Sequence, residues 1–324
     1  MSLLKRKFRS IKNGARVWFL KVYLAGKYDE NEVLIIASSP RSGSTLLGEV
    51  MGRLDGAAGL FEPLHLLHVP AAQRAGFITR TYVRPNAEWP EGEAFLRSVF
   101  KGDVVNSWTS RDMTVAHAFK SRFLIVKFVR ATRLLPWLCT QFPLRPPVLL
   151  IRHPCAVVAS QLRYGWENTP RPEEPDFLDE FPEFRAALQK TETVEEFLAA
   201  QWALDQLPAL MAPAPHAWVT VTYEALLAQP RAVLGKILNA WGKSADIDTL
   251  IAGLMVPSSV VSSSGMSGTA GWKKQLSESQ VSKILKVVES FGITFYTEAP
   301  EPDEALLYSP SIAENIKKAG RGSK

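Results

Sequence analysis

The chain has 324 residues, of which 46% are hydrophobic and 22% charged, and its formal net charge is +6. These proportions are typical of a folded globular protein and exclude a disordered or fibrous chain. The charge is concentrated at one end, because residues 1–30 hold eight lysines and arginines against two acidic residues and the remainder is formally neutral. A neutral body argues against a nucleic-acid-binding surface spread over the fold.

The basic segment, residues 1–30, has the periodicity of an amphipathic helix. Its apolar residues recur every three or four positions and form one stripe, namely Leu4, Phe8, Ile11, Ala15, Trp18, Val22 and Ala25. Two placements fit such a helix: the stripe lies on an anionic membrane as a peripheral contact, or it packs on the protein's own body. A transmembrane span is not expected, because the apolar run at residues 17–25 is short and contains Lys21.

The rest of the chain alternates strand and helix patterns. Short apolar runs of strand length occur at residues 33–37, 123–128, 148–151 and 218–221. Helical patterns occur at residues 44–54, 155–164, 194–207, 231–241 and 278–291. The alternation predicts a single α/β domain over residues 31–297, with a doubly wound, mostly parallel sheet flanked by helices. Residues 298–324 are predicted to form a loosely held tail.

The stretch SSPRSGSTLL, residues 38–47, has the features of a phosphate-binding loop between the first strand and the first helix. Successive backbone N–H groups and the positive end of a helix starting at Ser44 or Thr45 would face a bound anion. Gly43 permits close approach of the backbone, and the hydroxyls of Ser42, Ser44 and Thr45 add hydrogen-bond donors. The loop therefore predicts a P-loop type of fold.

The loop lacks the lysine of nucleoside-triphosphate-binding loops. When Gly43 is aligned with the second glycine of that pattern, Ser44 takes the place of the lysine. Chemistry on ATP needs that charge and usually Mg²⁺, so a kinase or triphosphatase is disfavoured. Arg41 lies inside the turn instead, where its guanidinium can grip an anion. The ligand is predicted to be a nucleotide with a short 5′ anion.

Three further segments carry polar residues at informative places. In VLLIRHPCAVVASQLR, residues 148–163, a strand delivers Arg152 at its carboxyl end and Ser160 follows within the next helix. VTVTYEALLAQP, residues 219–230, contains Tyr223 directly after a strand. GLFEPLHLLH, residues 59–68, lies in the stretch that would form the next strand or its edge.

Taken together, these motifs resemble the sulfotransferase superfamily from about residue 33 to 291, and most closely its carbohydrate and tyrosylprotein branch. The resemblance implies that the loop binds the 5′-phosphosulfate of 3′-phosphoadenosine 5′-phosphosulfate (PAPS). It also implies that Arg152 and Ser160 hold the 3′-phosphate and that Tyr223 lies near the adenine. Arg41 would neutralise charge on the leaving phosphate, and the mechanism requires no metal.

The resemblance also implies a catalytic base. Glu62 stands in a Phe-Glu-Pro pattern like that of carbohydrate and tyrosylprotein sulfotransferases, whose glutamate takes the acceptor's proton. Its apolar neighbours in the sequence are expected to raise its pKa. His65 and His68 are the alternative bases, because histidine titrates nearer neutrality. His117 has no motif around it.

Other parts of the resemblance leave alternatives open. Lys127 and Arg130 in IVKFVR correspond to a family segment near cofactor and acceptor, or they form a solvated strand end. GWKKQLSESQV, residues 271–281, resembles the family's late tryptophan segment, but SSSGMSGTAG at 262–271 stands where cytosolic members carry Arg-Lys-Gly. Hydroxyl and backbone donors, or Lys273, would then replace that clasp on the 3′-phosphate.

The predicted function is transfer of a sulfuryl group from PAPS to a hydroxyl of a glycan or small molecule, with adenosine 3′,5′-bisphosphate as product and a carbohydrate as the favoured acceptor. A P-loop kinase or triphosphatase and a non-catalytic nucleotide-binding module are the alternatives. The cysteines, Cys139 and Cys155, do not suggest a disulfide framework. The chain is therefore compatible with a reducing compartment such as the cytoplasm.

Overall fold

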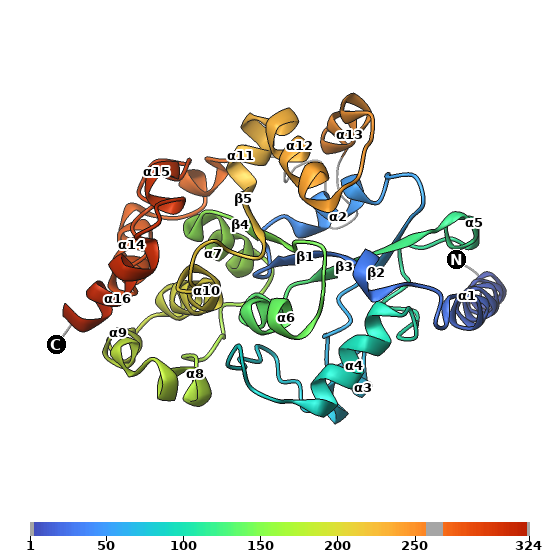
Figure 1. Cartoon of the computed structure of the whole chain (residues 1–324). Helices are drawn as coiled ribbons and strands as arrows, with labels where there is room; N and C mark the ends of the chain where they lie inside the picture. Colours follow the sequence, from blue (N-terminus) through green and yellow to red (C-terminus); the bar gives the residue numbers. More distant parts are fainter. Residues whose placement is uncertain (1–2, 257–267, 323–324) are drawn as a thin grey trace.

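A computed structural model describes residues 3–256 and 268–322 of the chain (Figure 1). At its centre lies a five-stranded sheet with the order β2-β3-β1-β4-β5, in which every neighbouring pair is parallel. The strands are β1 (Leu34–Ser38), β2 (Ala57–Phe61), β3 (Phe123–Phe128), β4 (Val148–Ile151) and β5 (Val219–Thr222). The predicted fold class, a single α/β domain with a parallel sheet, is confirmed.

Helices cover both faces of the sheet, which explains why its strands are continuous apolar runs. Along β1, Leu34 and Ile36 point to one face, where they pack with buried residues of α2 (Ser44–Met51), α12 (Pro230–Trp241) and α13 (Ile247–Leu254). Ile35 and Ala37 point to the opposite face and belong to two other buried clusters. The strict alternation of side chains in a strand thus divides the core into two layers.

The opposite face is covered by two groups of helices. Near β2 and β3 lie α1 (Leu3–Leu24), α3 (Pro70–Arg74), α4 (Pro90–Phe100), α5 (Val115–Lys120) and α6 (Leu135–Gln141). Near β4 lie α7 (Pro154–Arg163), α8 (Pro175–Glu180), α9 (Arg185–Gln189), α10 (Val194–Leu210) and α14 (Glu278–Ser290). A short helix, α11 (Tyr223–Ala228), directly follows β5.

The predicted elements coincide with observed ones to within a few residues at their ends. The third and fourth observed strands match the predicted ranges, whereas β1 and β5 each begin one residue later than predicted. The five predicted helices correspond to α2, α7, α10, α12 and α14. Their starts follow local rules, because Ser277 and Thr193 form capping boxes and Pro154 and Pro230 occupy first helical positions.

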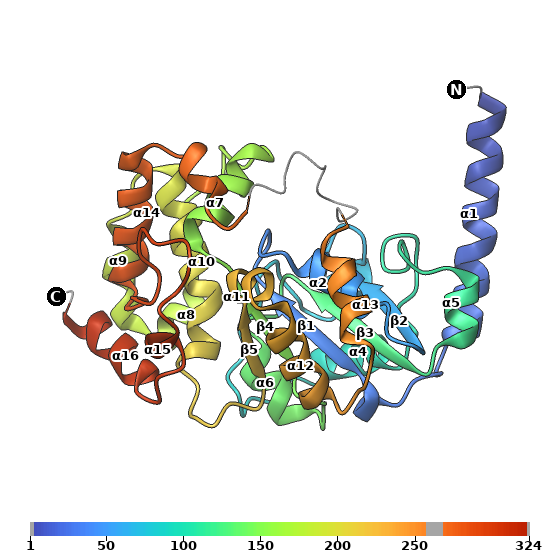
Figure 2. The same ribbon diagram turned by 90° about the horizontal axis from the view of Figure 1, so that it is seen from above.

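The C-terminal segment is not loosely held, contrary to the sequence prediction. It forms α15 (Glu304–Leu307) and α16 (Ile312–Gly322), and the side chains of Leu307, Ile312 and Ile316 are buried in the same cluster as α7 and α10. The charged composition of this segment conceals these apolar contacts, because they are spaced for a short amphipathic helix. At the other end of the molecule, α1 lies beside α5 (Figure 2). Within the described ranges, the helices are too short or too polar to cross a membrane.

Candidate active site

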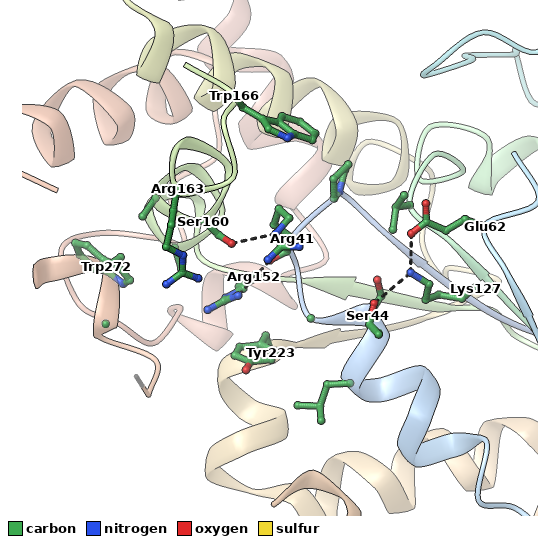
Figure 3. A pocket seen from close by; sticks show the side chains of 18 of the residues that line it. Arg41, Ser44, Glu62, Lys127, Arg152, Ser160, Arg163, Trp166, Tyr223 and Trp272 are labelled. Atoms are coloured by element: carbon green, nitrogen blue, oxygen red, sulfur yellow. Dashed lines mark hydrogen bonds and ion pairs between the residues drawn. The ribbon is translucent and has the colours of Figure 1, made fainter. Parts of the chain in front are cut away.

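The candidate site lies at the carboxyl ends of the strands, beside the point where the chain connections from β1 and β4 diverge. In open parallel sheets this edge is where ligands bind. A cavity of about 400 Å³ opens there, and its lining comes from the segments that follow all five strands (Figure 3). Figure 3 shows labelled side chains across it: Glu62 and Lys127 at one end, Trp272 and Arg163 at the other, and Arg41, Arg152 and Ser160 between.

The loop after β1 has the strained backbone that a phosphate-binding turn requires. Arg41 has φ of 72°, in the left-handed region that favours glycine, and Gly43 has φ of 91°. A Cβ atom at Gly43 would lie 2.4 Å from the ring of Tyr223, so only glycine fits between the loop and this ring. The turn is thus shaped both by its own sequence and by the segment after β5.

The loop hydroxyls do not all face the cavity. Ser44 and Thr45 line it, at the start of α2, whose first N–H groups and positive dipole end are directed there. Ser42 is fully buried, and its hydroxyl lies 3.2 Å from that of Ser39. Ser39 in turn accepts a hydrogen bond of 2.8 Å from Gln206. The side chain of Ser42 therefore supports the turn from inside.

Arg41 extends from the loop to α7. Its Nε donates a hydrogen bond of 3.0 Å to Oγ of Ser160, and its guanidinium stacks 3.8 Å from the ring centroid of Tyr164. Arg41 and Ser160 are 119 positions apart in the sequence. The structure therefore brings together two residues whose motifs predict contacts with opposite ends of one nucleotide.

Arg152 contacts both the loop after β1 and the segment after β5. It follows β4, donates from Nη1 to the backbone oxygen of Arg41 at 3.1 Å, and its guanidinium lies 4.3 Å from the ring centroid of Tyr223. Its Nε is buried and has no hydrogen-bond partner among the described residues. Burial lowers the pKa of Arg152. A buried cation with a free donor is costly unless an anion binds it, so this geometry favours an anionic ligand.

A buried network holds Arg152 in this position. His153 caps α7, because its ring Nδ1 accepts a hydrogen bond from the backbone N–H of Cys155 at 3.1 Å. The backbone N–H of His153 donates to the carboxylate of Glu224 at 3.0 Å. Its ring stacks on Trp272, and burial lowers the pKa of His153 to about 4. The histidine is therefore neutral at pH 7, which leaves Nδ1 free to accept the capping hydrogen bond.

Glu62 lies at the other end of the cavity, in a polar setting. Its carboxylate forms ion pairs with Lys127, at 2.8 Å, and with Arg130, at 3.2 Å. The prediction of apolar surroundings is therefore wrong for the carboxylate. Phe61 and Pro63 flank Glu62 in the sequence, but its side chain points to Lys127, near the end of β3, and to Arg130, just after it. Its backbone has φ of 43°, and its N–H donates to the carbonyl of Lys127 at 2.9 Å.

Lys127 supplies an ammonium group close to the loop that lacks a lysine of its own. The residue is only 5% exposed, so it is not a solvated strand end. Its Nζ lies 3.4 Å from Oγ1 of Thr45 as well as 2.8 Å from Glu62. Burial lowers the pKa of Lys127, and the Glu62 carboxylate opposes this shift. The β2–β3 register aligns Phe61 with Lys127, which brings Glu62 and the lysine together.

The two alternative bases, His65 and His68, and the third histidine, His117, lie in different places. His65 lines the cavity, and its Nδ1 is buried without a partner among the described residues. Burial, followed by the charge of Arg130, lowers the pKa of His65. His68 is exposed and stacks on Trp108 at 3.9 Å, outside the cavity lining. His117 is exposed on α5 and does not line the cavity.

The far end of the cavity is formed by the segment around Trp272 and by the end of α7. Trp272 is buried, and Nε1 of its ring has no partner among the described residues. Arg163 and Trp166 also line this end. Residues 262–267, which make up most of the segment SSSGMSGTAG (262–271), lie outside the described residues. Lys273 is not among the residues that line the cavity.

The cavity is strongly basic. Its lining includes six arginine and lysine side chains, listed as Arg41, Arg111, Lys127, Arg130, Arg152 and Arg163. Glu62 is the one carboxylate among the lining residues that the structure describes. Such an excess of positive charge in a concave site attracts and holds anionic ligands. In the described ranges, no group of three or more histidine, cysteine, aspartate or glutamate side chains is arranged to hold a metal.

Comparison with known proteins gives one family match. A model of the sulfotransferase family matches residues 34–246, which include the loop, Glu62, Arg152 and Tyr223. A search of curated proteins gives no match.

Several solved structures are similar in fold. The sulfotransferase domain of an olefin synthase from Synechococcus PCC 7002 is 22% identical, with a TM-score of 0.43 over 80% of this chain and 94% of that one. A mouse sulfotransferase complexed with PAP is 14% identical, with a TM-score of 0.45 over 83% and 87%. A sulfotransferase domain from the curacin biosynthetic pathway is 18% identical, with a TM-score of 0.40 over 88% and 95%. These likenesses are remote and carry no argument about substrate.

Proposed function

Because the chain belongs to the sulfotransferase family, we propose that it transfers a sulfuryl group from PAPS to a carbohydrate hydroxyl, and that residues 31–297 form the catalytic domain. The observation that supports this most directly is a single basic cavity in which Arg41 is hydrogen-bonded both to Ser160 and to Arg152, with Glu62 at one end. The two elements proposed to bind phosphate and a carboxylate thus line one cavity.

The residues present suit a nucleotide with two anionic ends. The buried Nε of Arg152 lacks a partner among the described residues, so a 3′-phosphate would satisfy it. Ser160 adds a hydroxyl at the same place. The start of α2 and the side chain of Arg41 suit the 5′ end, because both offer N–H donors to an anion. Tyr223 lines the cavity beside Arg152, where its ring and hydroxyl are suited to contact the adenine.

When bound, PAPS supplies the sulfuryl group: its S–O bond to the 5′-phosphate breaks as a bond forms between sulfur and the acceptor oxygen. Glu62 accepts the proton that the acceptor hydroxyl loses. The ion pairs with Lys127 and Arg130 orient its carboxylate. Arg41 neutralises the charge that develops on the leaving phosphate oxygen. Lys127 lies between Glu62 and Thr45 and stabilises charge on the sulfuryl oxygens.

A carbohydrate acceptor suits the Glu62 end of the cavity. Trp108 and Phe61 line it beside Glu62, with ring centroids 5.1 Å apart, and aromatic faces pack well against sugar rings. Arg111 lies 4.3 Å from the ring centroid of Phe61 and adds hydrogen-bond donors for hydroxyl oxygens. His65 is the second candidate base, because it lines the same end of the cavity as Glu62.

Ligand-induced stabilisation tests the proposal. Adenosine 3′,5′-bisphosphate at 100 times its dissociation constant is expected to stabilise the protein by about 2.7 kcal/mol. ATP with Mg²⁺ is expected to give no comparable stabilisation, because the loop lacks its lysine. Stabilisation by ATP with Mg²⁺ alone would favour a kinase or triphosphatase instead.

A transfer assay separates an enzyme from a binding module. With PAPS and a panel of saccharides, we expect release of adenosine 3′,5′-bisphosphate together with a sulfated sugar. A protein that binds the bisphosphate yet transfers nothing to any hydroxyl compound would be a non-catalytic module.

A further inference from the structure

The described members of the apolar stripe on the basic N-terminal helix do not pack on the body of the protein. Four members of the stripe have described side chains, and all four are exposed: Ala15, Trp18, Val22 and Ala25. Trp18 is 67% exposed and Val22 is 61% exposed. The other members, at positions 4, 8 and 11, have side chains outside the described part. Of the two placements that the sequence allowed, packing on the body is therefore wrong for these four residues.

A different face of α1 attaches the helix to the body. Leu20 and Leu24 are fully buried. Arg16 donates hydrogen bonds to the backbone oxygens of Ser110 and Met113, at 2.7 and 2.6 Å. In Figure 2, α1 stands at one edge of the molecule, and its N-terminal turns extend beyond the neighbouring elements. The attachment thus fixes the helix with Trp18 and Val22 directed outward.

The exposed stripe has aromatic and basic neighbours. Phe119 of α5 is 56% exposed, and its ring centroid lies 5.4 Å from that of Phe19 and 4.8 Å from that of Tyr23. Lys21 is exposed next to Val22. Tryptophan and other aromatic rings beside lysines are the side chains that favour the boundary between lipid headgroups and acyl chains.

The charge distribution identifies the partner. The whole formal charge of +6 resides in residues 1–30, whereas the remainder of the chain is neutral. A helix of 22 residues is about 33 Å long, and seven of the eight basic residues of this segment, from Lys5 to Lys21, belong to it. A second copy of the chain would bring the same positive segment and would be repelled, whereas an anionic surface would attract it.

We propose that α1 docks on an anionic lipid surface, with Trp18 and Val22 inserted at the headgroup boundary and the lysines in contact with acidic headgroups. The docking is peripheral, because the helix lies on the surface and does not cross it. It brings the domain to the membrane in a fixed orientation, since Arg16, Leu20 and Leu24 fasten the helix to the body. The proposal is independent of the sulfotransferase reaction.

Co-sedimentation of the full chain with vesicles tests this. We expect binding to vesicles of phosphatidylcholine with about one third phosphatidylserine, and at least tenfold weaker binding to pure phosphatidylcholine. Trp18→Glu should reduce binding to the anionic vesicles by about tenfold or more, because it removes apolar area and adds a negative charge. Lys21→Gln should reduce binding about fivefold, and salt should weaken binding of the wild type.

Leu306→Glu is the matched control, since Leu306 is an exposed apolar residue on α15, at the opposite side of the molecule from α1 (Figure 1). It adds the same charge and should leave vesicle binding unchanged. Both glutamate variants should keep the wild-type unfolding temperature and the stabilisation by adenosine 3′,5′-bisphosphate. If Trp18→Glu unfolds the chain, Lys21→Gln carries the test.

Three results would overturn the proposal. The first is no binding to anionic vesicles, and the second is equal binding to neutral and anionic vesicles. The third is a concentration-dependent dimer of the wild type, seen by sedimentation velocity, that Trp18→Glu converts to a monomer while vesicle binding is retained. That last result would assign the stripe to a second copy of the chain.

Discussion

The two ends of the cavity are built in different ways. At the nucleotide end, each element comes from a short continuous block of sequence: the loop with Arg41, and the strand and helix that carry Arg152 and Ser160. At the Glu62 end, a carboxylate from one strand meets cations from the neighbouring strand, 65 and 68 positions away. The first end is a set of local motifs, and the second exists only once the sheet has formed.

This difference explains what the sequence reveals. The glycine, the hydroxyls and the helix start of residues 38–47 are a local signal for an anion site, because backbone N–H groups and the helix dipole act within a few residues. The position of Arg152 follows from the rule that ligands bind beyond the carboxyl ends of parallel strands. Four of the five strands, all except β2, were also predictable, since strands buried on both faces read as apolar runs.

What the sequence does not reveal are contacts between distant segments. The apolar neighbours of Glu62 predict a hydrophobic setting, but the β2–β3 register, which pairs Phe61 with Lys127, places a buried ammonium beside the carboxylate. The inward turn of Ser42 and the contact between Gly43 and Tyr223 depend on α10 and on the segment after β5. The packing of Leu307, Ile312 and Ile316 on the body is hidden by the charged composition of the segment around them.

Replacing the carboxylate should separate the two ends most sharply. In Glu62→Gln, sulfuryl transfer should fall by about 10² to 10⁴, because the amide cannot accept the acceptor's proton. The dissociation constant for adenosine 3′,5′-bisphosphate should stay within about twofold, since Arg41 and Arg152 are unchanged. Steady-state kinetics and calorimetric titration measure the two quantities.

The surface variant Glu88→Gln, at an exposed position, serves as the control and should keep full activity. Wild-type turnover in Glu62→Gln would transfer the role of base to His65.

At the nucleotide end, His153 should make the free energy of unfolding depend on pH. Its pKa of about 4 lies below the ordinary value of 6.5, so between these values the unfolded chain binds a proton that the folded chain does not. The contribution of this group to stability is therefore complete above pH 6.5 and is lost as the pH falls to about 4. At 1.36 kcal/mol per pKa unit, it amounts to about 3 kcal/mol.

His153→Asn isolates this effect. Asparagine can cap α7 in the same way but does not titrate, so the free energy of unfolding should fall less steeply between pH 6.5 and pH 4. The variant should be less stable than the wild type at pH 7, because it loses the stacking on Trp272. Urea unfolding at a series of pH values measures both. Parallel curves for the two proteins would rule out His153 as the source.

Removing the guanidinium at the nucleotide end should weaken binding. Arg152→Gln is expected to lower the affinity for adenosine 3′,5′-bisphosphate by about 10- to 100-fold, the range for losing charge-assisted hydrogen bonds. The matched variant Arg111→Gln lies at the acceptor end, 4.3 Å from Phe61. It should leave this affinity within about threefold and raise KM for the acceptor instead. Equal losses of nucleotide affinity in both variants would mean that the two ends do not bind separate ligands.

The smallest expected effect tests how closely the loop and Tyr223 fit. In Gly43→Ala, the new Cβ would lie 2.4 Å from the Tyr223 ring, and the residue would keep a φ of 91° that alanine disfavours. The ring is also held by Arg152, so its displacement disturbs the proposed 3′-phosphate site. We expect a loss of about 1–2 kcal/mol in unfolding free energy and about tenfold in nucleotide affinity.

Gly59→Ala, on β2 of the same sheet, is the control for this substitution. A Cβ there meets nothing within 4 Å, so alanine should be neutral or slightly stabilising and should not alter nucleotide affinity. Urea unfolding and calorimetric titration of both variants make the comparison. If Gly43→Ala binds the nucleotide as the wild type does, the loop does not need the close contact with Tyr223. The shape of the nucleotide end would then depend on the loop sequence alone, as a purely local motif would.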